Sequence, residues 1–164
     1  MSAPVAWPPA GVTQRVLELK ELANLIRGLS GGEDYAGHLN RYLAVRSAGL
    51  VEAVRDDVAD QHCRAMSPAR PHRRITSGLR RGLGTRPDQL ITFVQSFDVQ
   101  WAEELKQWLE DNDGERKNQL SALVGARVKI AHGDGSSVQA RQALEWADTA
   151  LEIAVWLVTR FDPR

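Results

Sequence analysis

Apolar residues recur at the spacing of an α-helix through most of the 164-residue chain, and no stretch shows the sustained alternation of a β-strand. Short turn signals separate the helical runs, and Gly ends a helix readily because it takes the left-handed conformation of a C-terminal cap without steric cost. The pattern predicts helices over 12–29, 33–66, 72–83, 87–97, 99–110, 115–132 and 138–161. The sequence therefore indicates an all-α fold, a bundle of long antiparallel helices with additional short helices.

The first eleven residues are rich in Pro and predict a flexible arm. The remaining residues, 12–164, are few enough for one domain and numerous enough to bury a real core. A helix end is expected at Gly133 and Gly135, directly after His132.

Four further features predict local structure. Asp98 is expected to cap the helix that follows it, and Thr85 to cap a helix that starts at Pro87. The segment Ser136-Ser-Val-Gln139 has the capping-box pattern. Gly49 interrupts the long predicted helix 33–66; because Gly in a helix interior costs about 1 kcal/mol relative to Ala, we expect a close helix–helix crossing there.

Composition excludes several classes of protein. Positive and negative side chains balance at 21 each, and the single Cys63 rules out an intramolecular disulfide framework. No apolar run is long enough to span a membrane, and the N-terminus lacks the features of a signal peptide, so we expect a cytoplasmic protein. No metal-binding or cofactor-binding motif occurs, and we therefore predict neither a metal nor a cofactor.

Charge is nevertheless concentrated locally. Residues 61–87 contain seven Arg and no acidic residue. Such a block is either a solvated helix face or a surface that contacts phosphates. Five of its residues are candidate RNA contacts: Arg70, Arg73, Arg74, Arg80 and Arg81.

The main candidate site is the pair Arg127 and His132, at the end of the predicted helix 115–132. Five positions correspond to about 140° around an ideal helix, so the two side chains suit a site that a second copy completes. The spacing alone is weak, because a chance match is expected and a second one, Arg55 with His62, is interpreted as accidental. The alternative for the main pair is that Arg127 binds an acid while His132 caps the helix.

Three segments in order resemble the HEPN superfamily, specifically its RiboL-PSP-HEPN branch, whose mark is an Arg followed by His after four to six residues. They are RYLAVRSAGLVE (41–52), FDVQWAEELKQWL (97–109) and LVGARVKIAHG (123–133). The resemblance implies a HEPN-like helical domain that homodimerises through its core helices, so that both Arg–His pairs converge. Proteins of this type are often metal-independent endoribonucleases that act as toxins or antiphage-defence effectors.

The resemblance also implies residue roles. His132 would act as general acid and base on a ribose 2′-hydroxyl, and Arg127 would hold the scissile phosphate, leaving a 2′,3′-cyclic phosphate and a 5′-hydroxyl. Such chemistry is reasonable, because imidazole titrates near neutral pH and a guanidinium matches phosphate oxygens. Val128 stands where the family usually places a polar residue, with Lys129 as the nearest polar neighbour.

The matching first segment contains three further candidates, Arg46, Ser47 and Glu52, which either line the cleft or tie helices together. Two other functions stay open. A catalytically silent module would bind RNA or a protein partner such as an antitoxin, and a purely structural domain would only dimerise.

Overall fold

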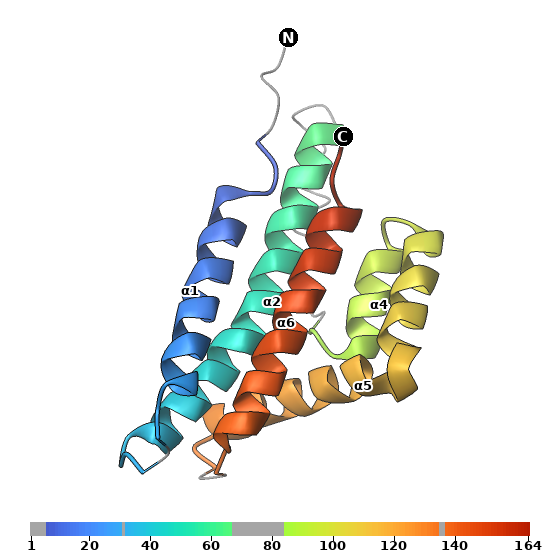
Figure 1. Cartoon of the computed structure of the whole chain (residues 1–164). Helices are drawn as coiled ribbons and strands as arrows, with labels where there is room; N and C mark the ends of the chain where they lie inside the picture. Colours follow the sequence, from blue (N-terminus) through green and yellow to red (C-terminus); the bar gives the residue numbers. More distant parts are fainter. Residues whose placement is uncertain (1–5, 31, 67–83, 135–136) are drawn as a thin grey trace.

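The computed structural model of the chain describes residues 6–30, 32–66, 84–134 and 137–164. Every regular element in these ranges is an α-helix, which confirms the predicted all-α class: α1 (Ala10–Arg27), α2 (Ala36–Met66), α4 (Pro87–Gln95), α5 (Val99–Ala131) and α6 (Ala140–Arg160) (Figure 1). None of these helices combines the length and apolarity needed to cross a membrane. The predicted helix 72–83 lies outside the described residues.

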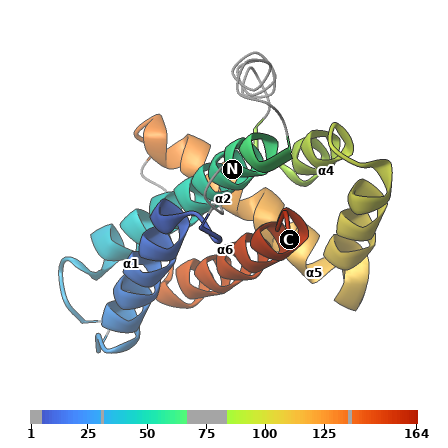
Figure 2. The same ribbon diagram turned by 90° about the horizontal axis from the view of Figure 1, so that it is seen from above.

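Helices α1, α2 and α6 lie side by side, and the second half of α5 crosses α2 and α6 near one end (Figures 1 and 2). The expected antiparallel packing holds for α1, whose first residues lie beside the ends of α2 and α6. Helices α2 and α6, however, run in the same direction: His62 meets Phe161 near their C-terminal ends, and Asn40 binds the Val138 carbonyl near their beginnings. Helices α2 and α6 can run in the same direction because α4 and α5 lie between them in the sequence, and α5 brings the chain back to the end where α2 begins.

Helices α2 and α6 make the most extensive helix–helix contact among the described residues. Six alanines of these two helices are almost completely buried: Ala44, Ala48, Ala143, Ala147, Ala150 and Ala154. The distance between packed helices depends on side-chain size at the contact, so alanines let these two helices approach closely. The close crossing expected at Gly49 is wrong, because a Cβ at that position would meet no atom within 4 Å.

Aromatic rings join the C-terminal ends of α2 and α6 to α4 and the start of α5. Phe161 lies 5.0 Å from Phe97, 5.3 Å from Trp101 and 5.6 Å from His62, measured between ring centroids. Each pair meets edge to face, the arrangement that aromatic quadrupoles favour. This cluster fixes the short helix α4 and the first half of α5 against α2 and α6.

The helix starts follow the predictions only in part. Asp98 caps α5 as expected, accepting a hydrogen bond of 3.0 Å from the Trp101 amide. Helix α4 begins at Pro87 as predicted, but its N-cap residue is Arg86 rather than Thr85. Helix α6 begins at Ala140, two residues later than predicted, and the side chain of its N-cap residue Gln139 makes no capping hydrogen bond. The predicted capping box includes Ser136, which lies outside the described residues.

A sharp kink divides α5 in two. Asn112, Asp113 and Gly114 all have positive φ angles, of 57°, 58° and 72°. The turn predicted at these residues is therefore confirmed, and it lets the second half of α5 leave α4 and cross the other helices (Figure 1). That change of direction determines where the end of α5 lies.

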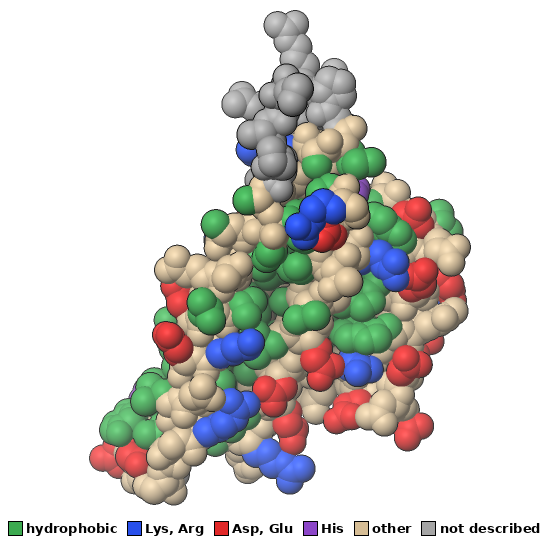
Figure 3. All heavy atoms as spheres, turned by 45° about the horizontal axis from the view of Figure 1, so that its top comes forward, with side chains coloured by type: hydrophobic (Ala, Val, Ile, Leu, Met, Phe, Trp, Pro, Cys, Tyr) green, Lys and Arg blue, Asp and Glu red, His purple; other side chains and the backbone are tan. Residues whose placement is uncertain are grey.

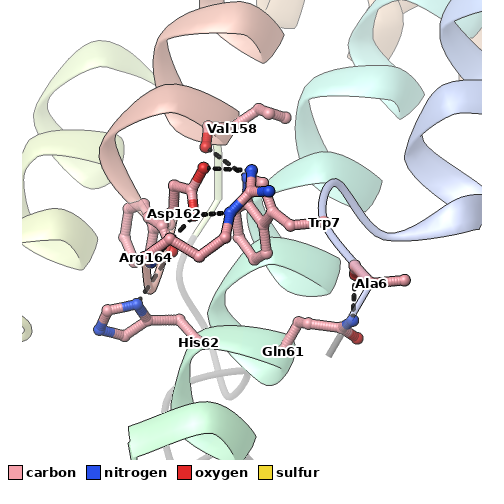
Figure 4. A network of polar contacts seen from close by, with 8 residues as sticks. Ala6, Trp7, Gln61, His62, Val158, Asp162 and Arg164 are labelled. Carbon is pink, nitrogen blue, oxygen red and sulfur yellow. Dashed lines mark hydrogen bonds and ion pairs between the residues drawn. The ribbon is translucent and has the colours of Figure 1, made fainter. Parts of the chain in front are cut away.

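The N-terminal segment makes hydrogen bonds to two helices (Figure 4). The Trp7 indole donates to the Val158 carbonyl at 3.0 Å, and Gln61 donates to the Ala6 carbonyl at 2.9 Å. Residues 6 and 7 of the predicted arm therefore contact α2 and α6, while residues 1–5 lie outside the described part. The physical reason is that α6 leaves carbonyls unpaired in its last turn, and the indole both satisfies one of them and packs on the core.

Replacing Trp7 tests this docking. We expect Trp7→Ala to lower the free energy of unfolding by about 2 kcal/mol, because a half-buried indole and its hydrogen bond are both lost. Trp7→Phe keeps most of the packing and should cost about 1 kcal/mol. Urea denaturation measures both values. An unchanged stability in Trp7→Ala would show that the segment is undocked in solution.

Gly133 ends α5 as predicted. Its φ is +73°, its amide binds the Ile130 carbonyl at 3.1 Å, and the Asp134 amide binds the Lys129 carbonyl at 3.0 Å. This pair of bonds is the Schellman motif.

Two glycines of α5 and its cap provide a matched comparison. An added Cβ meets no atom within 4 Å at either Gly125 or Gly133, and they differ in that only Gly133 has a positive φ. Gly133→Ala should therefore lower the free energy of unfolding by about 1 kcal/mol, whereas Gly125→Ala should raise it by about as much. Thermal and urea unfolding of both variants would check this; equal effects would contradict the assigned cap.

Candidate active site at the end of helix α5

His132 directly follows the last residue of α5. Its backbone amide continues the helix by binding the Val128 carbonyl at 3.1 Å. The side chain is exposed, and no hydrogen bond or ring contact joins its imidazole to another described residue. The imidazole is therefore open to solvent and to any ligand that approaches the end of this helix.

Arg127 lies a little more than one turn earlier and is only half-buried, with 39% of its side chain exposed. Its guanidinium forms an ion pair with Glu52 of α2. The pair joins α5 to α2 and fixes the guanidinium near the point where the helices cross. Within one protomer this arrangement matches the alternative interpretation, in which Arg127 binds an acid.

The candidate supporting residues fall into two groups. Arg46 donates to Glu18 of α1 at 2.8 Å and to the Tyr42 hydroxyl at 3.1 Å, so Arg46 and Glu52 both tie α2 to a neighbouring helix. The hydroxyl of Ser47 is buried and donates to the Leu43 carbonyl at 2.7 Å, a bond within α2.

The residues between Arg127 and His132 are open to solvent. Lys129 is exposed, and Val128, at the position where the resembling family has a polar residue, is 46% exposed. Exposed Val128 makes no hydrogen bond through its side chain that could orient Arg127.

Arg127 lines a groove of about 330 Å³ between α1, α2 and the end of α5. Arg15 and Glu18 of α1 and Arg46 and Gly49 of α2 also line it. Sequence reasoning missed Arg15, because nothing in a linear pattern pairs α1 with the end of α5. The one sequence signal for the groove was Gly49, which has no side chain and lines the groove.

Glu18 and Arg46, which both line the groove, are stabilised in their charged forms. Hydrogen bonds from Gln14 and then from Arg46 lower the pKa of the Glu18 carboxyl below its ordinary value. Hydrogen bonds to Glu18 and Tyr42 raise the pKa of Arg46. Both shifts favour the ionised forms, so this pair stays charged at neutral pH.

The predicted RNA contacts Arg70, Arg73, Arg74, Arg80 and Arg81 lie outside the described residues. The other two Arg of the 61–87 block are described: Arg64 is exposed and forms an ion pair of 2.9 Å with Asp60, and Arg86 is exposed. Both are therefore accessible at the edges of the block.

The second Arg–His match has a structural role. The buried Arg55 donates to Asp56 and to the Gly84 carbonyl, each at 2.9 Å, and its guanidinium lies over the Phe93 ring. His62 lies 2.9 Å from the Phe161 carbonyl, within the aromatic cluster. Neither side chain is presented to a ligand, in keeping with its interpretation as accidental.

Other chemistry finds little support in the described part of the chain. Burial raises the pKa of the Cys63 thiol, which disfavours the nucleophilic thiolate. Among the described residues, no three His, Cys, Asp or Glu side chains cluster in a way that could hold a metal ion.

A larger groove of about 680 Å³ lies elsewhere, between α1, α6 and the first half of α5. Trp108 and Trp156 line it, with ring centroids 6.3 Å apart, and hydrophobic side chains are exposed on this face between charged ones (Figure 3). Arg116 lies over Trp108 and Arg160 over Trp156. Neither Arg127 nor His132 lines this groove, so the candidate site lies apart from it.

In comparisons with known proteins, no family model, curated protein or solved structure matches this chain. The resemblance to HEPN proteins therefore rests on the three sequence segments quoted above. The catalytic roles of Arg127 and His132 stay predictions.

Proposed function

We propose that this chain is a metal-independent endoribonuclease of the HEPN type, which acts as a cytoplasmic homodimer in a toxin or antiphage-defence system. The observation that carries the proposal is the position of the motif: Arg127 and His132 lie at an exposed helix end, and the imidazole is open to solvent. One protomer presents these groups on different sides of a helix. A second copy would supply the opposing set and enclose the substrate.

The reaction needs only the groups of the motif. His132 removes the proton from a ribose 2′-hydroxyl, whose oxygen attacks the adjacent phosphorus. The bond from phosphorus to the 5′-oxygen breaks, and a protonated imidazole, supplied by His132 of the second copy, returns a proton to the leaving oxygen. Arg127 stabilises the charge that develops on the phosphoryl oxygens. The products are a 2′,3′-cyclic phosphate and a 5′-hydroxyl.

Glu52 fits this mechanism as a residue that orients Arg127. Exposed ion pairs typically contribute only 0–1 kcal/mol, so a phosphate can take the place of the carboxylate without a large loss of stability. Until RNA arrives, Glu52 keeps the guanidinium near the α2–α5 crossing.

Cleavage of single-stranded RNA in EDTA tests the proposal. His132→Ala and Arg127→Ala should each reduce the rate by about 100-fold or more, because a proton-transfer group or a phosphate-stabilising charge is lost. Arg141→Ala is the matched control, since Arg141 is an Arg 89% exposed whose ion pair with Glu145 lies within α6. The 2′,3′-cyclic ends should be detectable by mass spectrometry, and DNA should stay intact.

Three results would contradict this function. They are a requirement for Mg²⁺, activity that survives both substitutions, and a protein that remains monomeric while cutting. The first two would remove the proposed roles of His132 and Arg127. The third would remove the need for a second copy.

Two observations favour a second candidate, a catalytically silent module that binds RNA or a protein partner such as an antitoxin. Val128 stands at the usual polar position, and the charge of Arg127 is already balanced by Glu52. Salt-sensitive RNA binding without cleavage, unchanged in His132→Ala, would favour this candidate. Detectable turnover would exclude it.

A further inference from the structure

We infer that the groove between α1, α2 and the end of α5 is a track for the phosphates of single-stranded RNA, in which Arg15 and Arg46 extend the grip of Arg127. The identity of the ligand as RNA rests on the proposed function. The groove itself, and the three Arg among the residues that line it, are features of the described residues.

Three different helices supply these cations. Arg15 comes from α1, Arg46 from α2 and Arg127 from α5, and all three line one groove of about 330 Å³. Each side chain is partly exposed, by 43%, 37% and 39% in that order. They are therefore accessible from solvent and are also held in place by the helices, which suits a groove that follows a nucleic-acid backbone.

Each guanidinium is held by one carboxylate on a neighbouring helix. Arg15 binds Asp57 at 2.5 Å, Arg46 binds Glu18 at 2.8 Å, and Arg127 binds Glu52. Of these three carboxylates, only Glu18 is among the residues that line the groove. The lining therefore carries three positive groups and one negative group, and the carboxylates hold the cations in position before a ligand arrives.

The exchange of partners is physically inexpensive. A guanidinium has five N–H donors, and ion pairs as exposed as these add little to stability. A phosphate can bind two donors of the same guanidinium at once, as a carboxylate does, so it can replace or share the existing partner. The carboxylates then compete with the ligand, which predicts that removing one of them tightens binding.

Gly49 keeps the groove open. It lines the groove, and an added Cβ would meet no atom within 4 Å. A long side chain placed there would therefore fill the groove without disturbing the core. Gly49→Gln should weaken RNA binding several-fold, whereas Gly49→Ala should bind as the wild type does.

The decisive experiment measures binding of a labelled single-stranded 2′-O-methyl RNA oligonucleotide by fluorescence anisotropy at several salt concentrations. This probe carries the phosphate backbone but has no free 2′-hydroxyl, so cleavage cannot interfere. Arg15→Gln should weaken binding about 3- to 10-fold and reduce the slope of log affinity against log salt by about one. Asp57→Asn should tighten binding, because Arg15 loses its competitor.

Arg27 provides the matched control. It lies on the same helix as Arg15, is 45% exposed, and forms a similar ion pair of 3.1 Å with Asp148 on α6, away from the groove. Arg27→Gln and Asp148→Asn change net charge as the test variants do, and both should leave binding unchanged. A purely structural Arg15–Asp57 pair would instead make both Arg15→Gln and Asp57→Asn less stable and change binding in neither.

The inference is overturned if the wild type does not bind the probe at low salt, if Arg15→Gln binds like Arg27→Gln, or if Asp57→Asn weakens binding. Its failure is distinguishable from that of the nuclease. If the protein cleaves RNA in EDTA but Arg15→Gln and Arg27→Gln bind equally, the proposed RNA-binding groove is wrong and the proposed nuclease activity stands. If the variants change binding as expected but no RNA is cleaved, the nuclease proposal is wrong and the RNA-binding groove stands.

Discussion

The structure depends on the extensive, parallel contact of α2 with α6, two helices that each carry alanines almost completely buried. Two consecutive helices joined by a short turn would run antiparallel, so this contact requires a long excursion of the chain between them. Helix α5 makes that excursion, kinked at residues 111–114, and it returns beneath the other helices. The end of α5, with Arg127 and His132, is thereby presented beside α2.

The same crossing explains the electrostatics of the candidate site. Arg127 meets Glu52 because α5 passes across α2, and α1 contributes Arg15 and Glu18 to the groove on the other side of the crossing. Cations and carboxylates alternate between helices, so each helix is tied to its neighbour through exposed ion pairs. Such pairs hold their geometry while remaining exchangeable, a useful property where an anionic ligand has to enter.

Local features of the fold could be predicted from the sequence, because helix period, glycine caps and turn residues act over a few positions. Three features of this kind were predicted correctly: the end of α5 at Gly133, the cap at Asp98 and the turn at 112–114. The docking of Trp7 on Val158, the direction of α6 and the role of Gly49 could not be predicted, since each depends on segments far apart in the sequence. That Arg127 binds an acid was one of two interpretations of the sequence, but its partner Glu52 could not be predicted, because 75 residues separate the two.

We propose that one protomer carries half of an RNA-cleavage site and that a second copy completes it. The decisive measurement is the RNA-cleavage rate per protein molecule in EDTA across a dilution series, alongside molar mass from light scattering. We expect this rate to rise over the concentration range in which monomer converts to dimer. A constant rate per molecule in a monomeric protein, or a stable dimer that never cuts RNA, would contradict it.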